Sequence, residues 1–221
     1  MRYFLAAVAL AGAVLAGLAF QREYAANMAT LDDAFTRIDR FAEGRPPAPL
    51  GWRAMRGLML ACIDMQQGFL LAIQPEAERR AVHDNCAAVA ADILARAPTA
   101  GSAHLVQAAS LADAGDSAGF DRALIAARAT APQEGWQAAR RHMLAAPRHD
   151  LLGNGARAAF DADVALLLQG RNGLAVLASS YVSIEPLRPV LETAVNAAPG
   201  DVQRRFLRLV REAMAAQMPA G

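Results

Sequence analysis

Few side chains in this sequence could carry out catalysis or bind a metal ion. The histidines are His83, His104, His142 and His149, and none has a second histidine, a cysteine or a carboxylate at metal-binding spacing with further ligands nearby. His142 and His149 flank Pro147, and we interpret them as solvated residues of a loop. All 22 basic residues are arginine, which excludes Schiff-base and P-loop lysines, and the common hydrolase, zinc-protease and dinucleotide-binding motifs are absent. We therefore predict a protein that is not an enzyme and that has no cofactor and no metal site.

The two cysteines are candidates for a disulfide. Cys62 lies twelve residues before Gln74, and Cys86 lies twelve residues after it. If residues 50–73 form one helix and a second helix begins after a turn at residues 74–75, both cysteines lie about 18 Å from the turn, at the same level. In an oxidising compartment this geometry favours a disulfide. In a reducing compartment the same side chains would be small apolar fillers of the core.

Arginines are the candidate binding groups. The net charge of +1 gives no reason to expect a nucleic-acid partner. A guanidinium group can nevertheless bind an anionic protein surface through paired hydrogen bonds. The helix predicted for residues 201–218 carries four arginines, although a solvated terminal helix would show the same pattern. The candidate partner-binding residues are Trp136, Arg140, Arg204, Arg205, Arg208 and Arg211, and the expected buried stripe of the last helix is Phe206, Leu207, Val210 and Met214.

The elements that position these groups are predicted to be helical, and the first of them to span a membrane. The chain is 55% hydrophobic but only 6% aromatic, which favours helices packed through small side chains over β-sheet. Residues 3–20 contain no charge and would span about 27 Å as a helix, which suffices for the core of a bilayer. We predict an uncleaved signal anchor at residues 1–22, with cleavage or a buried soluble helix as alternatives. The arginine before the run indicates a cytoplasmic N-terminus in a bacterial inner membrane, with the remaining chain in the periplasm.

A heptad pattern follows the anchor. Apolar residues at 24, 28, 31, 35 and 38 are spaced by 4, 3, 4 and 3 positions, and we predict one juxtamembrane helix over residues 23–44, ended by Gly44 and the prolines after it. This seam either packs on the chain's own helices or forms a homodimer through residues 24–38. Two heptads are too few for a stable coiled coil on their own. The seam residues are Tyr24, Met28, Leu31, Phe35 and Ile38.

The remaining residues, 45–221, contain a segment with a repeat-like period. Pro98 and Pro132 are 34 residues apart, which is the length of a tetratricopeptide repeat. The segment resembles one degenerate unit of that family, and the resemblance extends loosely over about half of the chain. Residues that match the family's pattern are Gly101, Ala108, Leu111, Gly115, Asp116, Leu124, Ala127 and Pro132, whereas His104, Gln107 and Phe120 depart from it.

The resemblance implies a fold and a mode of action. Tetratricopeptide proteins stack helical pairs and bind other proteins or peptides in the concave groove that results. We therefore predict an all-α protein in which an N-terminal transmembrane helix precedes antiparallel helical hairpins, arranged as a short tetratricopeptide-like solenoid or as an unrelated bundle. The expected function is that of a membrane-anchored scaffold or assembly factor for protein partners in envelope or surface-polysaccharide assembly. An accessory subunit of an integral membrane complex and a periplasmic ligand-binding or hydrolytic domain are the alternatives.

Overall fold

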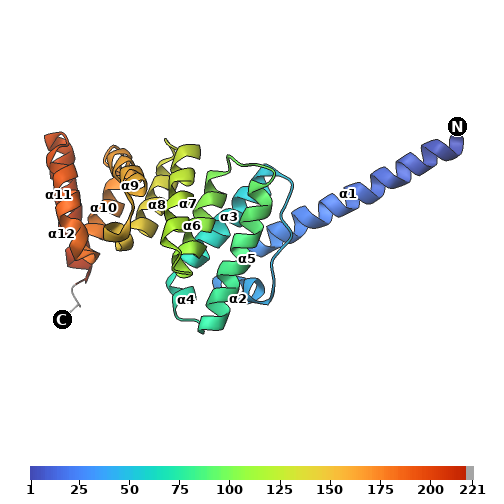
Figure 1. Ribbon diagram of the computed structural model, residues 1–221, viewed down its shortest axis with the longest axis horizontal. Coiled ribbons are helices and arrows are strands. Elements are labelled where there is room, and N and C mark those ends of the chain that lie inside the picture. Colours follow the sequence, from blue (N-terminus) through green and yellow to red (C-terminus); the bar gives the residue numbers. More distant parts are fainter. Residues whose placement is uncertain (218–221) are drawn as a thin grey trace. The chain divides into compact units, whose positions relative to one another are not determined.

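The computed structural model describes residues 1–217, and every regular element among them is a helix, as predicted (Figure 1). The chain divides into two compact units, Met1–Asp113 and Ala114–Gly221. The boundary falls between α6 (Gly101–Asp113) and α7 (Ser117–Thr130), the two helices of the segment that resembles a tetratricopeptide unit.

The first helix, α1 (Arg2–Leu31), is long and apolar enough to cross a membrane. Its most apolar stretch buries none of its residues within the protein, and Figure 1 shows this part of α1 projecting from the other helices of the first unit. The C-terminal part of α1 packs against α3 (Trp52–Gln66) through the fully buried Ala26 and Ala29. The same helix therefore joins an exposed apolar segment to the core of the first unit.

The prediction of a single juxtamembrane helix is wrong, because the chain bends after α1. A second helix, α2 (Ala34–Glu43), begins at Asp33, whose carboxylate accepts hydrogen bonds of 3.0 and 3.1 Å from two backbone N–H groups in the first turn. Arg37 donates to the backbone carbonyl oxygens of Thr30 and Asp32, at 3.2 and 2.7 Å. These bonds satisfy backbone groups at both helix ends and so stabilise the bend.

The bend leaves most of the heptad seam in solvent. Leu31 is 76% exposed, and Tyr24 and Phe35 are each 56% exposed, whereas Ile38 is buried. The alternative that the seam packs on the chain's own helices is therefore wrong for these three side chains. Homodimerisation through residues 24–38 stays a prediction.

The core of the first unit surrounds α5 (Glu76–Leu94), which packs against α2, α3 and α6. The helix predicted over residues 50–73 is divided at Gly68, where an added Cβ would lie 2.7 Å from the carbonyl oxygen of Asp64. Phe69 consequently lies in the short helix α4 (Phe69–Ala72), where it is 75% exposed. The α5 residues that face this core are fully buried, and they are Val82, Cys86, Val89 and Ile93.

A disulfide joins α3 and α5, as predicted. Cys62 and Cys86 are both fully buried, and their Cα atoms are 5.8 Å apart. The division of the first predicted helix does not disturb this pairing, because the break at Gly68 lies beyond Cys62 and the chain still returns between residues 67 and 75.

In the second unit, α9 (Asn154–Leu167) packs against α7, α8 (Gly135–Ala145) and α10 (Arg171–Ser183), and α10 packs against α12 (Gly200–Gln217). Gly173 permits a close approach at the junction of α9 and α10, because an added Cβ would lie 2.7 Å from the Cα atom of Leu167. The last helix begins one residue before its predicted start, and its predicted last residue, Met218, lies outside the described residues. The unit also contains η1 (Ala146–Leu151), η2 (Glu185–Leu187) and α11 (Arg188–Asn196).

Candidate functional site

Trp136 and Arg140, two of the predicted binding residues, line a groove of about 720 Å³ in the second unit. They share one face of α8 with Ala139 and Met143, at positions separated by three or four residues. The opposite face of α8 is buried, including Ala138, and so directs the first face outward. We call this hollow the α8–α10 groove, and the residues used below to describe it are Trp136, Arg140, Met143, Leu166, Arg171 and Val176.

The floor of the α8–α10 groove is formed where α9 meets α10. Gly170 and Gly173 line this floor. Because glycine has no side chain, α9 and α10 can approach each other closely there, and no side chain from these two positions fills the groove. Leu166 and Val176 provide apolar surface on either side of this junction. This wall could not be predicted from the sequence, because its residues are 30 to 40 positions from Trp136 and only folding brings them to α8.

The chemistry of the α8–α10 groove suits an apolar segment that carries acidic groups. Met143 is 44% exposed, and a methionine side chain can adapt to different apolar shapes. Trp136 is half-buried, and its indole N–H donates a 2.6 Å hydrogen bond to Glu134, which fixes the ring at the start of α8. Arg140 and Arg171 add two guanidinium groups among the lining residues. Tryptophan, methionine and arginine are the residue types enriched in protein interfaces.

The four predicted arginines of α12 do not line the α8–α10 groove. Arg205 pairs with Asp201 on the same helix, and Arg208 lies 3.7 Å from Glu212 in an exposed ion pair. Arg204 and Arg211 are exposed as well. The structure therefore separates the six candidates into one pair in the groove and four residues along an exposed helix.

The predicted buried stripe of α12 is half wrong. Phe206 and Val210 are buried, but Leu207 and Met214 are 50% and 56% exposed. The reason is that α12 packs against α10 and α11, which cover only one narrow strip of its surface.

A buried ion pair, which was not predicted from the sequence, packs on the side of α8 that faces away from the groove. The guanidinium group of Arg141 is 1% exposed and donates two 2.7 Å hydrogen bonds to the carboxylate of Asp163 on α9. Arg128 Nε lies 3.2 Å from the same carboxylate. Burial raises the pKa of the Asp163 carboxyl, while the two guanidinium groups oppose this shift. One feature of the sequence could have indicated that Arg141 is buried: it lies on the alanine-rich face of α8, beside Ala138 and Ala145.

The interpretation of His142 as a solvated loop residue is wrong. His142 lies inside α8 and is fully buried, with its Nε2 atom 3.0 Å from Ser180 Oγ and its ring stacked on Phe160. Burial lowers the pKa of His142 to about 4, and the neighbouring His149 ring adds to the shift. His149 is half-buried and contacts the same phenylalanine ring. Both histidines are packing residues in this structure.

A histidine, a serine and an aspartate also meet in the first unit, without the geometry of a catalytic triad. Ser110 Oγ donates to the backbone carbonyl oxygen of His83 at 2.9 Å and not to its ring. The imidazole lies 3.3 Å from the Gln66 amide and 3.7 Å from Asp113, and burial lowers the pKa of His83 despite that carboxylate. A nucleophile would need a hydrogen bond to the ring, so this cluster connects α3, α5 and α6 structurally.

Within residues 1–217, no group of three or more histidine, cysteine or acidic side chains is arranged to hold a metal ion. No protein-family model, curated protein or solved structure matches the chain. We therefore infer function from the chain's own residues.

Proposed function

We propose that this protein is a membrane-anchored scaffold or assembly factor that binds a partner protein in the α8–α10 groove. The observation that carries this proposal is the outward face of α8, where Trp136, Arg140 and Met143 border an apolar hollow of about 720 Å³. A partner segment with one large apolar side chain and nearby acidic residues would complement this surface, because the apolar group leaves water while the carboxylates pair with Arg140 and Arg171. The arginines of α12 form a second, polar contact surface in this proposal.

The proposed location is the bacterial inner membrane, with residues 3–20 as the anchor, the N-terminus in the cytoplasm and the main part of the chain in the periplasm. Two features support it. One is the exposed apolar part of α1, and the other is the buried Cys62–Cys86 disulfide, a bond that persists in oxidising compartments. The resemblance to tetratricopeptide proteins supports a helical-repeat arrangement and a role in envelope or surface-polysaccharide assembly.

Photo-crosslinking in living cells tests the proposed groove. A photoreactive amino acid at position 143 should give one dominant crosslinked protein, and the same amino acid at position 125 should not. The two positions are matched, because Met143 and Ile125 are 44% and 40% exposed in the same unit, and only Met143 lines the groove. A Trp136→Ala substitution should remove the crosslink at position 143. Equal labelling from both positions, or a crosslink that survives Trp136→Ala, would contradict the groove assignment.

A second candidate function, that of an accessory subunit of an integral membrane complex, is favoured by the exposed seam. Tyr24, Leu31 and Phe35 expose more than half of their surface directly after the anchor, where another chain could cover them. A photoreactive amino acid at position 31 distinguishes the possibilities. A product of twice the chain mass indicates the homodimer through residues 24–38, whereas a product with a different membrane protein indicates the complex. The absence of either product would remove support for both.

A further inference from the structure

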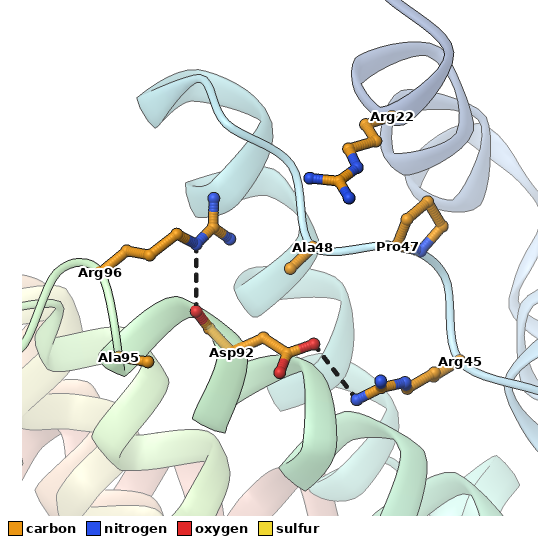
Figure 2. Close-up of a pocket in the computed structure, with 7 residues that line it drawn as sticks. All are labelled: Arg22, Arg45, Pro47, Ala48, Asp92, Ala95 and Arg96. Atoms are coloured by element: carbon orange, nitrogen blue, oxygen red, sulfur yellow. Dashed lines mark hydrogen bonds and ion pairs between the residues drawn. The ribbon is translucent and has the colours of Figure 1, made fainter. Parts of the chain in front are cut away.

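Three arginines from separate parts of the first unit surround a pocket of about 620 Å³ (Figure 2). Arg22 lies on α1, Arg45 lies in the segment between α2 and α3, and Arg96 follows α5. Figure 2 shows the Arg22 side chain extending from α1 toward the segment that contains Pro47 and Ala48, and the Arg45 side chain extending from the same segment toward Asp92, which also contacts Arg96. The remaining lining residues are Pro47, Ala48, Asp92 and Ala95.

The pocket has more positive than negative charge. Arg45 forms a 3.1 Å ion pair with Asp92, the one carboxylate among the lining residues. Arg96 is held by two backbone carbonyl oxygens, those of Asp92 at 3.1 Å and Pro49 at 3.0 Å, which neutralise no charge. Arg22 is exposed, and no hydrogen bond or ion pair joins its guanidinium group to the described residues 1–217. Two of the three guanidinium groups thus have no carboxylate partner.

The pocket also lies close to the end of the apolar run in α1. Arg22 follows Phe20, the last residue of that run, by two positions, which is about 3 Å along a helix axis. Glu23, the next residue, accepts 2.6 Å hydrogen bonds from the backbone N–H groups of Leu50 and Gly51. These bonds hold the start of α3 at the level of Arg22, and Trp52 at that start is 63% exposed. Exposed tryptophan and arginine side chains are typical anchors at a membrane–water interface.

From these observations we propose that the arginine pocket binds the phosphate group of an anionic phospholipid in the leaflet where α1 leaves the membrane. The inference rests on the proposed membrane anchoring. Arg22 offers an unoccupied planar fork of N–H donors, which matches two phosphate oxygens, and Arg96 is already oriented by its carbonyl partners. A bound headgroup would connect α1, the segment of residues 44–51 and the end of α5, and would fix the first unit against the membrane surface.

Native mass spectrometry of the full-length protein in a non-ionic detergent tests the pocket. We expect phosphatidylglycerol to be retained at least fivefold better than phosphatidylcholine of the same chain length. Arg22→Gln should remove most of this preference, and Arg122→Gln should not. The two variants are matched, because each removes one charge from an exposed helical arginine to which the structure assigns no bond, and Arg122 lies in the second unit. Equal phosphatidylglycerol retention by both variants would overturn the proposal.

Two further measurements are needed. One distinguishes a lipid phosphate from a soluble phosphate group, and the other tests membrane anchoring on its own. If millimolar inorganic phosphate displaces the phosphatidylglycerol, the pocket binds soluble phosphate groups and the lipid assignment is wrong. Extraction of cell membranes with carbonate tests anchoring independently, because an anchored chain stays in the pellet whether or not the pocket binds lipid. The crosslink at position 143 tests the scaffold function, and Arg22→Gln should leave it unchanged.

Discussion

Arg141 places a guanidinium group in the interior of the second unit, directly behind the face of α8 that borders the groove. Its charge is compensated by Asp163, and two more of its N–H groups contact the backbone carbonyl oxygens of Ala127 and Ala131, at 3.3 and 3.4 Å. Removing the carboxylate would leave a buried cation without its counter-charge. The resulting loss of stability is larger than the stability that such a pair adds relative to apolar side chains of similar size. The pair therefore makes the orientation of α8 depend on α9.

We expect Asp163→Asn to lower the free energy of unfolding by about 3 kcal/mol, because Arg141 and Arg128 lose their shared negative partner. Asp161→Asn is the control, since Asp161 is exposed on the same helix two positions earlier, and its substitution should change stability by less than about 0.5 kcal/mol. Urea unfolding of the full chain in mild detergent, followed by circular dichroism, measures both. Similar losses in the two variants would show that the buried pair does not stabilise the unit.

His142 makes stability depend on pH in a defined window. Its pKa is about 4 in the folded protein and about 6.5 in an unfolded chain, so between these values the unfolded state binds a proton that the folded state does not. Stability should be constant above pH 6.5 and should fall as the pH decreases toward 4, by up to about 3 kcal/mol from this residue. His142→Gln, which keeps a donor near Ser180, should reduce the slope of the profile between pH 6.5 and 4, and the slope that remains includes His83, whose pKa is also lowered by burial. An unchanged slope in His142→Gln would contradict this assignment.

At the scale of the elements, the bend between α1 and α2 depends on a helix cap. Asp33→Ala removes the acceptor for the first turn of α2, and we expect the amide hydrogens of α2 to exchange with solvent roughly fivefold faster. Asp33→Asn keeps an oxygen acceptor and should behave almost like the original chain. Hydrogen exchange read by mass spectrometry over residues 34–43 compares the three proteins. Slower exchange in Asp33→Ala, as a continuous helix from α1 would produce, would contradict the role of the cap.

Most helices could be predicted because their ends carry local signals. Pro75 precedes α5, and Gly44 follows α2. The heptad spacing failed at Asp33 because it counts apolar positions and does not include hydrogen bonds from side chains to the backbone. Spacing alone therefore predicts one continuous helix through Asp33, although Asp33 caps the start of a new helix.

The candidate site could be predicted only in part, for a related reason. Trp136 and Arg140 are one helical turn apart, so their common face follows from α8 alone. The walls from α9 and α10, and the Arg141–Asp163 pair across 22 positions, depend on how helices pack, which local periodicity does not contain. His142 lies in a helix and not in a loop, because α8 continues to Ala145, two residues before Pro147, and η1 follows directly.

On the scale of the whole molecule, the proposed anchoring and the proposed partner binding belong to different compact units. The first unit contains the apolar helix, the disulfide and the arginine pocket, and the second contains the α8–α10 groove and α12. Substitutions in one unit can therefore test one activity while the other serves as an internal reference.

The disulfide also determines how the protein responds to proteases. Residues 67–75 connect α3 to α5 and expose Phe69 and Ile73, so they are accessible to cleavage. Cys62 and Cys86 lie on opposite sides of this segment, and a cut within it would leave both fragments covalently joined. Such a nicked chain would run as one band in a non-reducing gel, and it would separate into two pieces only after reduction.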